Sequence, residues 1–465
     1  MLTPAISLPL ISGTTSAYPF NVAITSDGKF AYAAGAGNGL TNGSVTVIDT
    51  ATNTVVGSPL ALPANAIAYD VAFTTDGQFA YVTGYIIGTG SVVFVFDTQA
   101  AQNPATQASA LVDTITTTLT LISSSNGIAI NGSFAYVSNY VDGTVSVIDT
   151  TTNTVVGSPI PISAGSSAVA FTPDGQFAYI TGNNNTNGST NKVNVINTQA
   201  AQNPATQASA LVNTITLSDA VSGIAITPDG QFAYVLHINS GTVIVINTAT
   251  GAVVGSPIVV GGGPSGIAIS PDGQFAYVTN SFDNTVSVID TQKAQTPTTQ
   301  ANAVVNTLKV STYPYGIAIT PDGQFAYTAN SVNSTVSVIA LATLSNLPDG
   351  TVNAAYSSTL TVSDAAAGAS TFAVTTGSLP PGLSLDAATG KITGTPTATG
   401  SYSFTVTASG TVRGLTQVLP QDYTVTISAV GITSGATAVP TLGDVTLALL
   451  ALLLAGGAAL RMRRY

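Results

Sequence analysis

The stretch Gly-Ile-Ala-Ile-Thr-Pro-Asp-Gly-Gln-Phe-Ala-Tyr occupies residues 316–327, and relatives of it recur along most of the chain. Each copy ends in a tyrosine, and successive tyrosines are 49, 55, 43, 55, 43 and 50 residues apart. A repeat of this length is one supersecondary unit that cannot bury its own apolar faces, so neighbouring units must stack. The seven tyrosines are Tyr32, Tyr81, Tyr136, Tyr179, Tyr234, Tyr277 and Tyr327.

The sixth copy shows what one unit contains. Short runs rich in β-branched and aromatic residues cover 266–270, 275–280, 285–290 and 304–308, and the turn signal Pro271-Asp272-Gly273 separates the first two. Runs of this length bounded by Gly, Pro, Asn and Asp predict strands, and no segment sustains a helical period. Four strands per repeat, at a period in the forties to fifties, are typical of a β-propeller blade.

The two ends of the repeat array predict how the ring closes. The seventh copy stops near residue 340 without a fourth strand, whereas the chain begins with an apolar run at residues 5–11 that resembles the fourth strand at 304–308. We therefore expect the N-terminal strand to complete the seventh blade, which removes an exposed sheet edge.

A second period is superimposed on the first. Residues 99–112 reappear verbatim as residues 199–212, so even-numbered blades carry a longer connection between their third and fourth strands. Surface loops accept extra length at a small entropic cost. We expect these connections to be tolerated surface insertions left by a two-blade duplication.

The repeats resemble the YVTN family of β-propellers, whose name-giving stretch stands intact here as Tyr277-Val278-Thr279-Asn280. The resemblance covers about residues 1–343 and recurs seven times. It implies an exported, surface-layer or cell-envelope propeller. The wider fold also includes seven-bladed lactonases, so the fold alone leaves both functions open.

A different pattern follows the repeats. Hydroxyl residues alternate with Tyr402, Phe404 and Val406, which predicts a half-buried antiparallel strand. About 85 residues of short strands and frequent turns are typical of a β-sandwich. This stretch is similar to the immunoglobulin-like domains of bacterial surface proteins, and with no cysteine in the chain such a sandwich lacks a disulfide.

The C-terminus carries an apolar run at residues 445–460, flanked by a short motif and a basic cluster. Sixteen helical residues span about 24 Å, which suffices for a transmembrane helix if the flanking residues extend it. The arginines then lie in the cytoplasm and the propeller outside. The motif is Val439, Pro440, Thr441 and Leu442, and the basic anchor is Arg461, Arg463 and Arg464.

This tail resembles an IPTL-type protein-sorting tail, which implies recognition by an exosortase-like membrane enzyme of Gram-negative bacteria. The family usually has Trp-Gly shortly after the motif, and Val445-Thr446 stands there instead. A plain single-pass anchor is the alternative interpretation.

The predicted fold is therefore all-β: a seven-bladed β-propeller, a small immunoglobulin-like β-sandwich and one C-terminal transmembrane helix. The predicted domains are the propeller at 1–343, the sandwich at 344–430, a linker at 431–438, and the motif, helix and basic tail at 439–465.

The few charged residues of the chain, most of them acidic, limit the classes of partner that the protein can bind. Only 6% of the residues are charged, and residues 1–443 hold 19 aspartates against six basic residues. Without a basic patch, nucleic acid is not an expected partner. Residues 1–28 show no signal peptide, so we expect the natural start to lie upstream.

Candidate catalytic residues are few. His237 is the only histidine and stands in an expected loop, where it is a weak candidate for the ligand-binding face. Acid–base pairs or metal clusters could be built only from aspartates, and the propeller has no arginine. The aspartates of the first hairpin turns suit turn geometry, with weak calcium binding as the alternative. These are Asp27, Asp76, Asp174, Asp229, Asp272 and Asp322.

We accordingly expect a non-catalytic, exported cell-envelope protein that carries no cofactor and no metal. Its expected partners are the membrane, an exosortase-like sorting enzyme and an unknown surface or matrix ligand. A seven-bladed propeller enzyme of lactonase type is the alternative. A component released after cleavage of the tail is a third possibility.

Deleting residues 1–12 should lower the melting temperature and promote association, because the deletion exposes the outer edge of the seventh blade. Thermal unfolding and size-exclusion chromatography measure both effects. Unchanged melting would argue against closure by the N-terminal strand.

Overall fold

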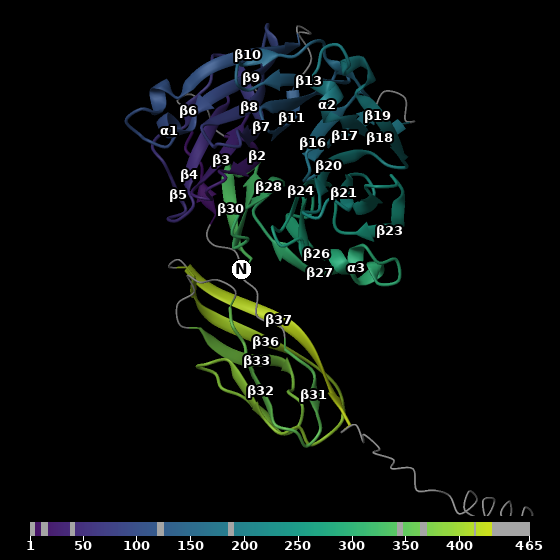
Figure 1. Ribbon diagram of the computed structural model, residues 1–465. Coiled ribbons are helices and arrows are strands. Elements are labelled where there is room, and N and C mark those ends of the chain that lie inside the picture. The colour runs from purple at the N-terminus through teal and green to yellow at the C-terminus, as the bar shows by residue number, and fades with distance from the viewer. Residues whose placement is uncertain are drawn as a thin grey trace, which may run out of the picture. The chain divides into compact units, whose positions relative to one another are not determined.

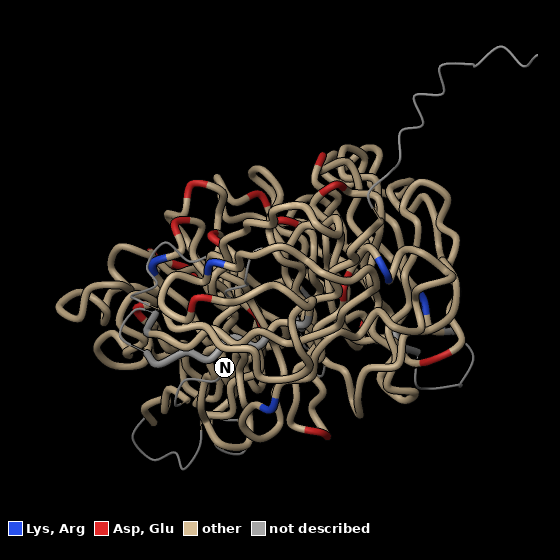
Figure 2. The backbone as a smooth tube through the Cα atoms, turned by 90° about the horizontal axis from the view of Figure 1, so that it is seen from below, with Lys and Arg blue, Asp and Glu red and all other residues tan. Residues whose placement is uncertain are grey.

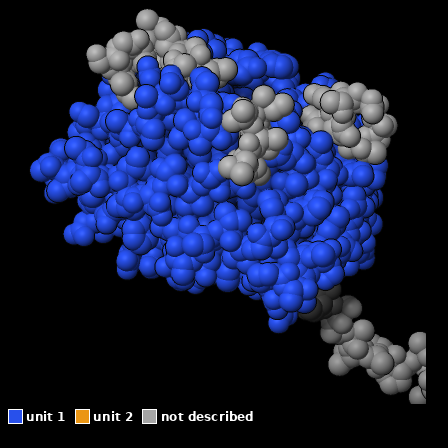
Figure 3. Space-filling model, turned by 90° about the horizontal axis from the view of Figure 1, so that it is seen from above, with its two compact units in different colours: residues 1–344, 362–370, 408–419 blue, residues 345–361, 371–407, 420–465 orange. Residues whose placement is uncertain are grey.

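The computed structural model describes residues 5–10, 17–37, 42–118, 125–184, 190–341, 347–362, 370–412 and 415–429. The chain divides into two compact units, of which Figure 3 shows the first in blue. The first consists of residues 1–344 with the segments 362–370 and 408–419, and the second contains the remaining residues. The predicted boundary at 343/344, the linker and the tail lie outside the described residues.

Seven antiparallel sheets form the first unit, and Figure 1 shows them arranged around a common centre. The inner strand of each sheet contacts the inner strands of the two sheets beside it, from β2 round to β28 and back to β2. The first unit is therefore a closed ring of seven blades.

The strands of the blades, from the inner strand outward, are as follows: β2 (Pro19–Ile24), β3 (Phe30–Gly35), β4 (Ser44–Asp49), β5 (Thr54–Val55) and β6 (Leu60–Ala61) in blade one; β7 (Ala66–Phe73), β8 (Phe79–Ile86), β9 (Gly90–Asp97) and β10 (Leu111–Thr118) in blade two; β11 (Ser125–Asn131), β12 (Phe134–Asn139), β13 (Thr144–Asp149), β14 (Thr154–Val155) and β15 (Ile160–Pro161) in blade three; β16 (Ser166–Phe171), β17 (Phe177–Asn184), β18 (Thr190–Asn197) and β19 (Leu211–Leu217) in blade four; β20 (Val221–Ile226), β21 (Phe232–His237), β22 (Thr242–Asn247) and β23 (Val253–Val259) in blade five; β24 (Pro264–Ile269), β25 (Phe275–Asn280), β26 (Thr285–Asp290) and β27 (Val304–Lys309) in blade six; and β28 (Pro314–Ile319), β29 (Phe325–Asn330), β30 (Thr335–Ala340) and β1 (Ile6–Ser7) in blade seven.

Ring closure involves the start of the chain. Strand β1 pairs antiparallel with β30, with Ile6 opposite Val336 and Ser7 opposite Thr335. The backbone N–H of Leu8 also donates to the carbonyl of Ser334 at 2.9 Å, and Leu8 is buried. The N-terminal strand thus occupies the outer position of the seventh sheet.

The repeated tyrosine lies in the second strand of each blade and packs between sheets. Five of the seven are fully buried, because both faces of that strand are covered by neighbouring blades. In six repeats the hydroxyl donates to the carbonyl of the residue that follows the third strand of the next blade, as from Tyr136 to Thr198 at 3.2 Å. The other pairs are Tyr32–Thr98, Tyr81–Thr150, Tyr179–Thr248, Tyr234–Thr291 and Tyr327–Thr50.

The long connections of the even blades are structured. Each begins with one helical turn and continues with a short 3₁₀ turn: α1 (Thr98–Ala101) and η2 (Gln107–Ser109), α2 (Thr198–Ala201) and η3 (Gln207–Ser209), and α3 (Thr291–Ala294) and η4 (Gln300–Asn302). The side chain of Asp97, Asn197 or Asp290 caps the helical turn by accepting a backbone N–H.

These connections are more than tolerated insertions, because a glutamine in each one forms hydrogen bonds to the backbone of the preceding blade. We call this contact the glutamine clamp. The amide of Gln207 donates to the carbonyl of Val156 at 2.9 Å and accepts from the N–H of Ser158 at 3.0 Å. Gly157 lies so close that an added Cβ would stand 2.2 Å from the Gln207 amide oxygen. Gln107 and Gln300 make the equivalent bonds to blades one and five.

Two further sheets, which lie largely in the second unit, pair in the orders β31-β37-β36-β33 and β32-β35-β34. Phe404 and Val406 are buried in β36, as predicted, and Phe404 stacks on Tyr423 with ring centroids 5.7 Å apart. The strands are β31 (Gly350–Thr351), β32 (Tyr356–Thr359), β33 (Thr371–Gly377), β34 (Leu383–Leu385), β35 (Lys391–Gly394), β36 (Gly400–Val412) and β37 (Leu415–Ser428).

Within the residues that the structure describes, no helix is long and apolar enough to cross a bilayer. The predicted transmembrane helix at 445–460, the motif Val439–Leu442 and the anchor Arg461, Arg463 and Arg464 all lie outside those residues.

Replacing Gln207 by alanine should lower the free energy of unfolding by about 2 kcal/mol, because two inter-blade hydrogen bonds are lost and the carbonyl of half-buried Val156 loses its donor. Urea unfolding measures the change. Gln176→Ala, an exposed glutamine on the first turn of the same blade, is the control and should change stability by less than about 0.5 kcal/mol. Equal effects of both variants would contradict the clamp.

Candidate functional site: the central channel

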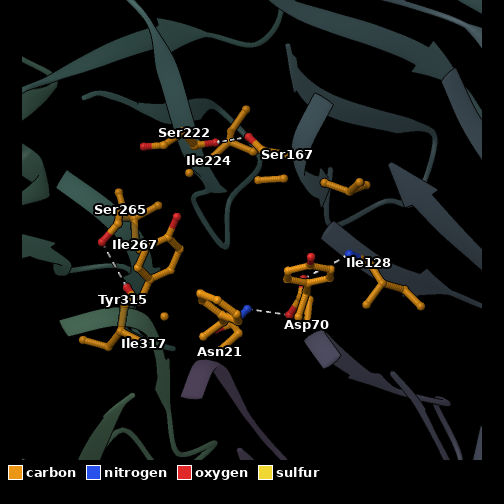
Figure 4. A pocket seen from close by; sticks show the side chains of 17 residues that line it. Asn21, Asp70, Ile128, Ser167, Ser222, Ile224, Ser265, Ile267, Tyr315 and Ile317 are labelled. Atoms are coloured by element: carbon orange, nitrogen blue, oxygen red, sulfur yellow. Dashed lines mark hydrogen bonds between the residues drawn. The ribbon is translucent and has the colours of Figure 1, made fainter. Parts of the chain in front are cut away.

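The inner strands of all seven blades surround a cavity of about 370 Å³ on the propeller axis (Figure 4). Blades four, six and seven, for example, contribute the residues within the register shift of the inner strand and the residue that ends the shift. The cavity is therefore a direct product of the ring, and the residue at each equivalent position decides its chemistry.

The two sides of the channel differ. Blades seven, one and two contribute Tyr315, Phe20, Asn21, Tyr69 and Asp70. Blades four to six contribute small residues at the equivalent positions, namely Ser167, Ala168, Ser222, Gly223, Ser265 and Gly266. The near-identical repeats thus enclose an asymmetric site, with aromatic rings and a carboxylate on one side and hydroxyls on the other.

Asp70 links three blades. One carboxylate oxygen accepts from the side-chain amide of Asn21 and from the N–H of Val71 at 2.8 Å. The other accepts from the N–H of Ile128 at 3.0 Å. Burial nevertheless raises the pKa of Asp70 to about 6, since these neutral donors only partly offset the loss of water.

The serine side is held by bonds between blades. The Ser167 hydroxyl donates to the carbonyl of Ser222 at 3.1 Å, and the Ser222 hydroxyl donates to the carbonyl of Pro264 at 2.8 Å. The Ser167 hydroxyl also bonds the Thr181 hydroxyl of its own blade at 3.1 Å. Because the Ser222 hydrogen is donated to the next blade, Ser222 presents lone pairs to the cavity.

His237 is not a loop residue, contrary to the sequence-based expectation. It ends strand β21, pairs with Thr242 and is only 2% exposed. Its Nε2 has no hydrogen-bond partner, and burial lowers its pKa. The corresponding residue in blades three, six and seven is a buried asparagine that bonds to a serine of the third strand, as Asn280 does to Ser287 at 2.9 Å. Blade five has Ile244 at the serine position, so His237 is a core residue and does not line the channel.

The turn aspartates have the local role that the sequence predicts. The carboxylate of Asp174 accepts from the Thr172 hydroxyl at 2.6 Å and from the N–H of Gln176 at 3.0 Å. The same pair of bonds recurs at Asp27, Asp76, Asp229, Asp272 and Asp322. In the described part of the chain, no group of three or more His, Cys, Asp or Glu side chains could hold a metal ion.

These aspartates also give one face of the disc its charge. First-to-second and third-to-fourth strand turns lie at the same end of an antiparallel blade. The turn aspartates therefore share a face with Asp49, Asp97, Asp149 and Asp290 at the ends of third strands. Figure 2 shows most acidic residues toward one side, with few basic ones among them.

Sequence reasoning missed the channel residues, although a signal was present. The inner-strand position before the apolar Ile/Val-Ala pair is Gly or Ala in five blades, whereas blades one and two have Asn21 and Asp70. A polar residue at a position that is otherwise small in an axial strand indicates a specific contact in the channel.

Comparisons with known proteins agree with this architecture. Residues 255–351 match the family model "Lactonase, 7-bladed beta-propeller", residues 338–428 match "Putative Ig domain", and residues 437–464 match "IPTL-CTERM motif". The chain thus combines a lactonase-type propeller region, an immunoglobulin-like domain and a sorting motif, as the sequence predicted. The sorting motif points to an exported protein of the cell envelope.

Among solved structures, hydrazine synthase of Kuenenia stuttgartiensis is similar, with a TM-score of 0.58 and 22% sequence identity. The match covers 71% of this chain and 99% of that chain. At this level of identity the similarity shows the fold alone. No curated protein sequence matches the chain.

The pKa of Asp70 predicts a pH-dependent stability. A carboxyl whose pKa is higher folded than unfolded stabilises the protein in its neutral form, and this contribution is lost as the pH rises through about 6. The unfolding free energy of the wild type relative to Asp70→Asn should therefore fall by about 2 kcal/mol between pH 4 and pH 7.5. Urea unfolding at a series of pH values measures this difference.

Asp76→Asn is the control for that series. Hydrogen bonds from Thr74 and Gln78 lower the pKa of Asp76, so its stabilising contribution is lost as the pH falls. The two variants should thus deviate from wild type in opposite directions. A flat difference for Asp70→Asn would show that its carboxyl is not perturbed.

Proposed function

We propose that this protein is a non-catalytic binding propeller displayed on the surface of the cell envelope. The match of residues 437–464 to the IPTL-CTERM motif carries the proposal, because a sorting tail serves a protein that has left the cytoplasm. In this interpretation the immunoglobulin-like domain is a spacer, and the propeller presents its ligand site to a surface or matrix component.

The channel chemistry supports a binding role. Its titratable lining groups are Asp70, Tyr69 and Tyr315. Hydrolysis by general acid–base catalysis needs a group positioned to transfer a proton to the substrate. Asp70 is engaged by three neutral donors, and its partner Asn21 cannot transfer a proton at neutral pH. Among the described residues that line the cavity, none has a cationic side chain that would stabilise an oxyanion.

The proposed route to the surface uses the C-terminal segment. Residues 445–460 would span the inner membrane of a Gram-negative cell with the arginines in the cytoplasm, and an exosortase-like enzyme would recognise Val439–Leu442. Whether the enzyme releases the propeller or leaves it anchored decides between a secreted and a tethered protein.

The lactonase alternative is favoured by one observation, the family match at residues 255–351. That match covers blades six and seven and the start of the second unit, and it describes a fold that hosts more than one function. The enzyme alternative would assign Asp70 as the base that activates water, since it is the carboxyl in the channel lining.

A single set of strains tests this proposal. In cells that express the full-length protein, protease added outside should remove the propeller, whereas a chain truncated after residue 436 should be lost from the envelope fraction. Intact-mass analysis of the surface fraction shows whether the tail is cleaved. Protection of the propeller inside intact cells would refute surface display.

The enzymatic alternative is tested on the purified protein. Sugar-acid lactones and simple γ-lactones should be hydrolysed at the uncatalysed rate, and Asp70→Asn should leave that rate unchanged. Turnover that is lost in Asp70→Asn but retained in Asp76→Asn would establish the lactonase alternative instead.

A further inference from the structure

Three aromatic rings, those of Phe20, Tyr69 and Tyr315, line one side of the channel. The ring of Phe20 lies between those of Tyr69 and Tyr315, with centroid separations of 5.5 Å and 5.7 Å. The three rings come from blades one, two and seven and line the same cavity as Asp70, and Figure 4 shows Tyr315 and Asp70 on its wall. Aromatic faces carry partial negative charge, so the rings and the carboxylate create a region of one electrostatic sign.

That region lacks a balancing positive charge. The three donors to Asp70 are an amide side chain and two backbone N–H groups, all neutral. No basic side chain in the described ranges forms an ion pair with Asp70: the ion pairs there are Lys29–Asp27 and Lys293–Asp290, both at the surface. A partly buried carboxylate without a counter-ion is destabilised by its loss of water, and a cation that enters the channel would offset that loss.

The opposite side of the channel also favours a ligand that carries hydrogen-bond donors. Ser222 donates its hydroxyl hydrogen to the carbonyl of Pro264, so it presents acceptor lone pairs to the cavity. A cation or a hydrogen-bond donor is therefore complementary to both sides, whereas an anion would face a carboxylate and aromatic faces.

We propose that the central channel binds a small organic cation, an amine or quaternary ammonium group, between Asp70 and the rings of Phe20, Tyr69 and Tyr315. This inference rests on the proposed binding function and specifies its ligand class. Cation–π contact with aromatic rings, together with one carboxylate, is an arrangement by which proteins recognise ammonium groups. The cavity of about 370 Å³ lies within the usual range of small-molecule pockets, about 300–1,000 Å³.

The charge of the whole propeller favours the same ligand. The excess of aspartates over basic residues in residues 1–443 raises the local concentration of small cations around the disc. The channel selects among these cations, because its rings reward an organic ammonium group more than a strongly hydrated inorganic ion.

Isothermal titration calorimetry of the full-length protein with choline tests the proposal. Choline should bind at pH 8, where Asp70 is ionised, and its neutral isostere 3,3-dimethylbutan-1-ol should bind at least about tenfold more weakly. Binding of choline should weaken similarly at pH 5. The titratable groups that line the cavity are Asp70, Tyr69 and Tyr315, and both tyrosines stay neutral at pH 5 and pH 8, so that loss reports Asp70.

Two variants and two controls identify the site. Asp70→Asn should weaken choline binding at least about tenfold, whereas Asp76→Asn, which removes the same charge from an exposed turn, should leave it unchanged. Tyr315→Leu should weaken it several-fold and Tyr315→Phe should retain it, because phenylalanine keeps the aromatic face. Tyr315 is 40% exposed, so these changes do not disturb the core.

Three outcomes would overturn the proposal: equal binding of choline and its isostere, equal loss in Asp70→Asn and Asp76→Asn, or binding of the neutral sugar methyl glucoside without binding of choline. The external protease experiment measures surface display independently of choline binding. A displayed propeller that binds no choline would refute the ligand class alone, whereas a propeller retained inside the cell would refute the proposed function.

Discussion

The structure depends on one inter-blade interaction, the burial of the repeated tyrosine against the next blade. The aromatic ring of the tyrosine fills the space between two sheets, and its hydroxyl donates to the carbonyl that follows the third strand of the neighbouring blade. The apolar ring contributes burial free energy and the hydroxyl satisfies a backbone group, so one residue type serves both requirements of a sheet interface. Since Tyr327 makes this bond to Thr50 of blade one, the interface between the last blade and the first is built like the other five interfaces that have the bond.

Much of this architecture can be predicted from the sequence because the same strand and turn pattern recurs in every repeat. The hairpin aspartates, the four strands per unit and the seven copies each follow from short local patterns whose physical causes are independent of the rest of the chain. The alternation at Phe404 and Val406 likewise predicts a strand with one buried face, which β36 has. Local pattern and global fold agree here, as expected of a sequence that specifies one structure.

What could not be predicted depends on contacts between distant residues. The amide of Gln207 is an ordinary polar side chain in the sequence, and only the packed blades show that it lies against Gly157. His237 looked like a loop residue because its neighbours Asn239, Ser240 and Gly241 are turn formers, yet β21 extends to include it. Asp70 and Asn21 are separated by a whole blade in sequence and meet only on the axis.

The pairing of β1 with β30 has a kinetic consequence. Ile6 pairs with Val336, so a strand before the first complete blade finds its partner in the third strand of blade seven, far along the sequence. Closing so long a loop is entropically unfavourable until the intervening sheets have stacked, and such distant pairings slow folding. Pairing of β1 with β30 should therefore be a late step in the folding of this protein. A chain in transit across a membrane would keep its seventh sheet unfinished until both ends of the array had emerged on the same side.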